Sequence, residues 1–144
     1  MPALEWIIED SPAKTDVERL AEAVTAHGRA LAKGDALPVA CFVRSGTDIV
    51  AGAYGRTEFK RLFVLYLWVD APFRGKGLGS RLLQELEARA ILRGCIDSLI
   101  ETLSDEAASL YLRRGYAPLA TIPNYVGPFT RHILLKSLSV PRGD

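Results

Sequence analysis

The chain has 144 residues, of which 49% are hydrophobic, and a formal net charge of +1. This length and apolar content predict one compact globular domain over residues 1–144. The near-neutral charge and the lack of a basic run argue against a nucleic-acid surface. No apolar stretch is long enough to span a membrane.

Cysteine and histidine are scarce, which argues against a metal centre. Cys41 and Cys95 do not have the spacing of metal ligands, and His27 and His132 are the only histidines. The sequence therefore predicts no metal site and two reduced thiols in a cytoplasmic protein. Residues 1–5 also lack the basic region and apolar segment of a signal peptide.

The first part of the chain is predicted to alternate between strands and one helical region. A short apolar strand is expected at residues 4–8, and an amphipathic helix is expected from Asp16, with Gly28 as a point where it could divide in two. Further strands are expected, in chain order, at residues 39–43, 49–54 and 62–69, with a polar connection at 44–48 and a second turn at 55–60.

The most informative stretch is the glycine-rich segment that follows the apolar run at 62–69. Gly75, Gly77 and Gly79 are flanked by Arg74, Lys76 and Arg81, and the four-residue spacing of Leu78, Leu82, Leu86 and Ala90 predicts a helix over 80–93. Glycines allow the backbone to turn sharply, so that amides at the helix start point outward. With the helix dipole and the basic side chains, this segment predicts a site for phosphate, most simply a pyrophosphate.

Two common phosphate motifs do not fit this segment. A Walker loop needs Ser or Thr after its lysine, but Lys76 is followed by Gly77. A dinucleotide fingerprint needs a third glycine where Ser80 stands. An Arg-x-x-Gly-x-Gly pattern does fit residues 74–79. A glycine-rich turn with solvated basic residues is the alternative on these six residues alone.

Four more elements are expected after the glycine segment. Residues 96–102 predict a strand, and Ser104 or Asp105 could cap a helix that contains Tyr111 and ends at Gly115. Two closing strands are expected at 116–122 and 129–138, joined by a loop at 123–128.

At residues 74–79 the sequence resembles the GNAT superfamily of N-acetyltransferases. Residues 107–116, reading A-A-S-L-Y-L-R-R-G-Y, are similar to the family's A-x-x-(F/L)-Y-x-(K/R)-x-G-(F/Y) segment, and residues 131–136 resemble its last strand. The resemblance implies an α/β fold with a central, mostly antiparallel mixed sheet and helices on both faces. It also implies an acetyl-CoA-dependent N-acetyltransferase that acts on a small-molecule or peptide amine. A non-catalytic acyl-CoA-binding or sensor domain and a protein-interaction domain are the alternatives.

The resemblance also implies which residues contact acetyl-CoA. Amides of residues 74–80 would bind the pyrophosphate, and strand amides around 67–69, freed by a bulge and by splaying from the next strand, would meet the pantetheine arm and thioester. Ser104 stands where the family often has Asn. The expected cofactor-binding residues are Leu67, Trp68, Val69, Arg74, Gly75, Lys76, Gly77, Leu78, Gly79, Ser80 and Ser104.

Tyr111 stands at the family's usual general-acid position, where a phenol can protonate the leaving thiolate. Packing in the core is the alternative role. Glu101 is the candidate general base, because its strand neighbours are apolar and partial burial would raise the pKa of its carboxyl group. Glu58, Asp70, His132, a water relay and an amine that arrives neutral are the other options.

The acceptor side and the oligomeric state are less defined. An acceptor wall could be formed by Tyr54, Glu58, Phe59, Trp68, Asn124, Tyr125 and Phe129. Exposed strand edges suggest a homodimer.

Overall fold

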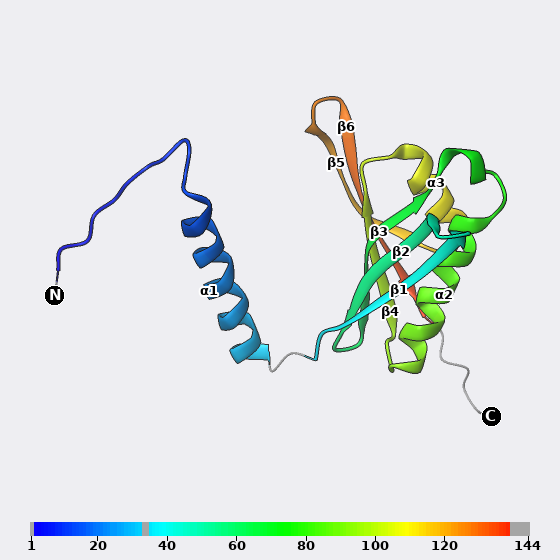
Figure 1. The fold of residues 1–144 in the computed structure, drawn as a ribbon, viewed down its shortest axis with the longest axis horizontal. Helices are drawn as coiled ribbons and strands as arrows, with labels where there is room; N and C mark the ends of the chain where they lie inside the picture. The colour runs from blue at the N-terminus through cyan, green and yellow to red at the C-terminus, as the bar shows by residue number, and fades with distance from the viewer. Residues whose placement is uncertain (1, 33–34, 139–144) are drawn as a thin grey trace. The chain divides into compact units, whose positions relative to one another are not determined.

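The computed structural model describes residues 2–32 and 35–138 and divides into two compact units, residues 1–34 and 35–144 (Figure 1). Each unit is described by itself. The single domain expected over 1–144 stays a prediction. Among the described residues, no helix is both long and apolar enough to cross a membrane.

The first unit contains one helix, α1 (Lys14–Ala32), with Asp16 in its first turn. Two predictions are wrong here. Residues 4–8 form no strand, since no strand in this unit offers them the hydrogen bonds that a strand needs. The helix also continues through Gly28, because a single interior glycine costs only about 1 kcal/mol.

The second unit is built on a six-stranded sheet in the order β1-β2-β3-β4-β6-β5. All neighbours are antiparallel except β3 and β4, which are parallel and joined through α2. The bounds are β1 (Leu37–Ser45), β2 (Asp48–Glu58), β3 (Arg61–Val69), η1 (Ala71–Phe73), α2 (Leu78–Leu92), β4 (Asp97–Thr102), α3 (Asp105–Arg113), β5 (Ala117–Val126) and β6 (Phe129–Ser137). The predicted mixed α/β class with a mostly antiparallel sheet is confirmed.

Both helices of the second unit pack on one face of the sheet. Leu62, Leu82, Leu86 and Leu134 are fully buried in one core between the sheet and the two helices, and Tyr111 of α3 joins the same core. Successive side chains of a strand point to opposite faces of the sheet, so the residues that alternate with those facing the helices lie on the opposite face. We call this second surface the open face. It presents Phe42, Tyr54, Tyr66 and Trp68, all more than a third exposed.

Three strand predictions need correction. Residues 62–69, whose apolar run favours a buried strand, are only partly buried, because Tyr66 and Trp68 lie on the open face. β2 extends to Glu58, which leaves only Phe59 and Lys60 as the turn, with Phe59 at φ 54°. β5 continues to Val126, through most of the predicted loop at 123–128.

A buried polar network ties the core together. The Tyr116 hydroxyl donates to Glu87 Oε2 at 2.9 Å and lies 2.7 Å from Ser98 Oγ, while Lys136 Nζ donates to Glu87 Oε1 at 2.7 Å. Burial and the Glu87 charge raise the pKa of Tyr116 far above its usual value, so the phenol stays protonated. This network links α2, β4 and β6.

Candidate active site

The site begins where β3 and β4 part. The two strands pair from Arg61–Asp97 to Val64–Ile100 and no further, whereas β3 continues to Val69. Beyond Val64, β3 keeps its hydrogen bonds to β2 on one side only. Backbone groups of residues 65–69 on the other side therefore face an opening in the sheet.

A bulge in β3 lies at the same point. The register with β2 shifts between Tyr54 and Gly55, so that Leu65 is the extra residue. A Cβ atom at Gly55 would overlap the backbone carbonyl of Phe63. Only glycine allows the two strands to approach this closely, and the bulge and splay expected for this strand are both present.

The glycine segment leads from β3 into α2. Gly75 and Gly77 both have φ 77°, a conformation that favours glycine, and Gly77 is the N-cap residue without a side-chain cap. Within the described chain, the backbone amides of Gly75, Lys76 and Gly77 donate no hydrogen bond. The Gly77 carbonyl accepts from the Arg81 amide, which begins the hydrogen-bond pattern of α2. The amides of residues 78–80 are the first-turn donors, which lack intrahelical partners. This arrangement of free amides at the positive end of a helix suits an anion.

The basic side chains of this segment take different directions. Arg74 Nε donates to the Val69 carbonyl at 2.9 Å, which ties the glycine segment to the end of β3. Lys76 lies over the Phe73 ring, with 5.9 Å from Nζ to the ring centroid. Arg81 points away and pairs with Glu85 at 3.9 Å. The backbone is thus the main source of donors here.

The opposite wall is α3, which Ser104 caps by accepting from the Ala107 amide at 3.1 Å. Tyr111 is 5% exposed, and burial raises the pKa of its hydroxyl above the ordinary value. It therefore remains a protonated phenol at neutral pH, as a proton donor must. Its ring lies 6.0 Å from that of Tyr116, in a tilted arrangement.

These elements enclose one cleft of about 530 Å³. Of the predicted residues, the cleft is lined by Leu67, Trp68, Val69, Arg74, Gly75, Gly77, Leu78, Gly79, Ser80, Ser104 and Tyr111. Lys76 and Glu101 are not among the lining residues. The sequence did not single out the other lining residues, which are Phe73, Glu106, Ala107, Leu110 and Arg113.

A further residue that sequence reasoning missed, Arg114, links the two walls of the cleft. Arg114 Nε, at the end of α3, donates to Ser80 Oγ in the first turn of α2 at 2.8 Å. The i, i+3 spacing of Tyr111 and Arg114 placed them on one helix side, but nothing local indicated Ser80 as the partner. The contact fixes the distance between the phosphate site and the helix that carries Tyr111.

The base candidates all have partners of their own. Glu101 Oε2 accepts from Arg131 Nη2 at 2.8 Å, and its side chain is 39% exposed. Glu58 pairs with Arg56 at 3.3 Å. Asp70 accepts from the Ala71 amide at 3.0 Å and caps η1. His132 Nε2 lies 2.7 Å from Asp105 Oδ1.

The proposed acceptor-side aromatics form two groups. Tyr54 and Tyr66 stack on the open face with their ring centroids 6.0 Å apart, next to Trp68 in the register. Tyr125 lies in the β5–β6 hairpin, where the Arg131 guanidinium sits 5.0 Å from its ring centroid. Phe59 is in the β2–β3 turn, and Asn124 and Phe129 are in the hairpin.

Comparison with known proteins identifies the family. The model of the acetyltransferase (GNAT) family matches residues 3–116. A blasticidin-S acetyltransferase of Streptomyces morookaense is 45% identical over 92 residues, which cover 63% of this chain and 68% of that protein. An acetyltransferase of Bacillus cereus has a similar crystal structure, with TM-score 0.78, 25% identity, and coverage of 92% of this chain and 98% of that one.

A further structural neighbour was solved with coenzyme A bound. It is an aminoglycoside 6′-N-acetyltransferase, with TM-score 0.63, 17% identity, and coverage of 92% of this chain and 84% of that one. The chain therefore belongs to the GNAT acetyltransferase family, as its motifs indicated. It is an acetyltransferase whose acetyl donor is acetyl-CoA.

Proposed function

We propose that the chain transfers the acetyl group of acetyl-CoA directly to a primary amine of a small molecule, with Tyr111 as the general acid. One observation carries this proposal: free amides at the start of α2, unpaired backbone along the end of β3 and the Tyr111 side chain all face one cleft. Acetyl-CoA supplies an activated thioester, and every other requirement falls on residues of this chain.

Binding of the donor is assigned to the backbone. Amides of residues 75–80 hold the pyrophosphate, while the positive end of α2 and Arg113 on the opposite wall add favourable potential. The inner edge of β3 at residues 67–69 offers donors to the pantetheine arm and to the thioester carbonyl oxygen. Fixed donors of this kind stabilise the negative charge that develops on the oxygen during attack.

The chemistry needs one proton donor and one proton acceptor. The neutral amine attacks the carbonyl carbon, the new carbon–nitrogen bond forms, and the carbon–sulfur bond breaks. The Tyr111 hydroxyl gives its proton to the departing sulfur, and solvent later restores it. The extra proton on nitrogen passes to Glu101 or to water, with Glu101 reached only if its ion pair with Arg131 opens.

The first acceptor to test is blasticidin S, because a relative at 45% identity is named for its acetylation. An amine on a peptide or protein is the other acceptor class. Aromatic side chains of the open face beside the cleft, Trp68 and Tyr66, suit a flat or cationic amine.

A thiol-release assay tests the proposal. Acetyl-CoA is supplied with blasticidin S, an aminoglycoside or a peptide with a free amine, and the acetylated product is identified by mass spectrometry. Release of coenzyme A with a small amine, lost in Tyr111→Phe, supports the proposal. Thermal stabilisation by coenzyme A without turnover on any amine would favour the acyl-CoA-binding or sensor domain instead.

A further inference from the structure

A second cavity lies beside the cleft, between α2 and the C-terminal end of α3. Its volume is about 350 Å³, and Ser80 and Arg113 line both this cavity and the cleft. Along α2 its lining continues from Ser80 to Gln84 and Glu87, which helical spacing places on one side of the helix. The two cavities are therefore neighbours, and we call the smaller one the side cavity.

The side cavity carries more positive than negative charge. Arg113, Arg114 and Lys136 contribute positive groups, and Glu87 contributes a carboxylate. Lys136 Nζ donates to Glu87 Oε1 at 2.7 Å, and the same buried carboxylate accepts from the Tyr116 hydroxyl at 2.9 Å. The charge of Glu87 is thus matched by Lys136, which leaves the two arginines to set the potential of the side cavity.

Both arginines have donors left for a ligand. Arg114 Nε donates to Ser80 Oγ at 2.8 Å, and because Ser80 lines both cavities, this contact holds the guanidinium where the two cavities meet. Within residues 2–32 and 35–138, neither the Nη atoms of Arg114 nor the side chain of Arg113 donates a hydrogen bond to a protein group. A guanidinium presents its N–H groups as a planar fork that matches the oxygens of a phosphate.

Acetyl-CoA carries phosphate in two places. Its pyrophosphate joins the pantetheine arm to a ribose, and a separate monoester phosphate stands on the 3′ carbon of that ribose. The monoester carries about two negative charges at neutral pH. Since the ribose is the next group of the donor after the pyrophosphate, its 3′-phosphate must lie within a sugar's length of the amides at the start of α2.

We propose that the side cavity binds the 3′-phosphate of acetyl-CoA through Arg113 and Arg114, an assignment that rests on the proposed function for the placement of the donor. Ser80 belongs to the first turn of α2, so the side cavity begins beside the amides that hold the pyrophosphate. The two arginines then distinguish coenzyme A from dephospho-CoA, the form that lacks this phosphate.

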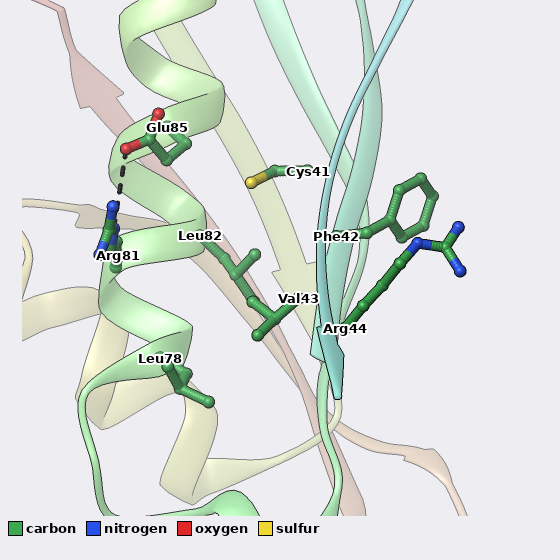
Figure 2. A pocket seen from close by; sticks show the side chains of 8 residues that line it. All are labelled: Cys41, Phe42, Val43, Arg44, Leu78, Arg81, Leu82 and Glu85. Atoms are coloured by element: carbon green, nitrogen blue, oxygen red, sulfur yellow. Dashed lines mark ion pairs between the residues drawn. The ribbon is translucent and has the colours of Figure 1, made fainter. Parts of the chain in front are cut away.

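The neighbouring basic residue Arg81 is unsuited to this role. It follows Ser80 in the first turn of α2, but its side chain pairs with Glu85 at 3.9 Å. Figure 2 shows this pair, which lines a different cavity between α2 and β1. Arg81→Met therefore removes a positive charge near the same helix start without touching the side cavity, which makes it a matched control.

Calorimetric titration of the full chain with coenzyme A and with dephospho-CoA measures the contribution of the 3′-phosphate. We expect the wild type to bind coenzyme A about tenfold more tightly, as charge-assisted hydrogen bonds to one phosphate would give. The ratio of the two dissociation constants should approach unity in Arg113→Met/Arg114→Met and keep its wild-type value in Arg81→Met. Equal affinities in the wild type, or a ratio that survives the double substitution, overturn the proposal.

Two further variants separate this contact from general effects on folding. Arg113→Met alone breaks no side-chain hydrogen bond or ion pair of the described chain, and it should lower the ratio by itself. Arg113→Lys/Arg114→Lys keeps the charges without the planar forks and should retain part of the preference. Each ratio compares two ligands on the same folded protein, so a loss of stability does not alter the outcome.

Turnover distinguishes a failure of this assignment from a failure of the proposed function. With acetyl-dephospho-CoA as donor, KM should rise while kcat stays the same, because the ground state and the transition state lose the same contact. An unchanged KM overturns the assignment even where the chain acetylates its amine. A preference for coenzyme A in the titrations without acetylation of any amine supports the phosphate site and rejects the proposed transfer.

Discussion

The two halves of β3 differ in whether they pair with the neighbouring strand β4. From Arg61 to Val64 the strands pair, and Leu62 and Val64 lie buried under α2. From Leu65 to Val69 the strands part, and the side chains alternate between the cleft and the open face. One continuous strand therefore serves as core along its first half and as a wall of the site along its second.

This difference shows how a sheet can offer backbone N–H donors to a ligand without leaving unpaired N–H groups buried in the core. Strand amides in a closed sheet are all used, so they cannot bind a ligand. At the end of β3, pairing with β2 holds the strand in place while the other side stays available. Substitutions in the paired half should therefore act on stability, and those around the opening should act on donor binding and turnover.

The largest effect is expected from Leu62→Ala in the paired half. Leu62 is fully buried, so its truncation should lower the free energy of unfolding by about 2–5 kcal/mol, measured by urea denaturation. Leu65→Ala, at the exposed bulge, is the control and should change stability by about 0.5 kcal/mol or less. Equal losses in the two variants would contradict the division of β3.

Tyr111→Phe should affect turnover in the cleft that opens where β3 and β4 separate. It removes the proposed proton donor but keeps the ring, so kcat should fall about 10²–10³-fold. Stabilisation by coenzyme A should persist in a thermal-shift assay. The matched control is Tyr116→Phe, whose hydroxyl serves the buried network and not the cleft, and which should lower stability more than kcat. Unchanged turnover in Tyr111→Phe would remove this residue from the mechanism.

Gly77→Ala should weaken donor binding. Gly77 has φ 77°, where an alanine costs about 1–2 kcal/mol, so KM for acetyl-CoA should rise about tenfold in steady-state assays. Gly94→Ala is the control, because Gly94 also has a positive φ of 87° but follows the C-terminal end of α2 and does not line the cleft. Similar KM values for both variants would mean that the turn at Gly77 does not position the amides.

The smallest effect concerns alkaline pH. Burial raises the pKa of Tyr111, so the folded protein holds this proton more tightly than the unfolded chain. The resulting stability is fully present below about pH 10, the ordinary tyrosine pKa, and is lost as pH rises through the folded value. In denaturation series above pH 10, wild type should lose more stability than Tyr111→Phe. Parallel curves would show that Tyr111 is not held in its protonated form.

Local sequence patterns correctly predicted the elements whose structure depends on a few neighbouring residues. The helix after the glycines, the cap at Ser104 and the turn glycines are all where the sequence placed them, because caps and positive-φ positions depend on a few adjacent residues. The mixed fold was implied by the resemblance to the GNAT superfamily, whose order of strands and helices the predicted elements match.

The incorrect predictions concern segments whose structure depends on contacts with residues that are distant in the sequence. Residues 4–8 have a strand-like composition but form no strand, since strands require a neighbour. The loop predicted at 123–128 is mostly strand because β5 is an edge strand, where Pro123 can be tolerated. The link from Arg114 to Ser80 joins residues 34 positions apart, and no local pattern indicates such a contact. The roles of Tyr111, Glu101 and the cofactor-binding residues stay predictions.

Gly55 offers no side chain to a ligand, yet it fixes where the bulge in β3 forms. Any larger residue would push against the Phe63 carbonyl and move the point at which the two parallel strands separate. A selection for enzymes with new acceptors could therefore vary the aromatic residues of the proposed acceptor wall while leaving Gly55 unchanged. Loss of activity in a Gly55 variant would report a displaced strand rather than a missing contact.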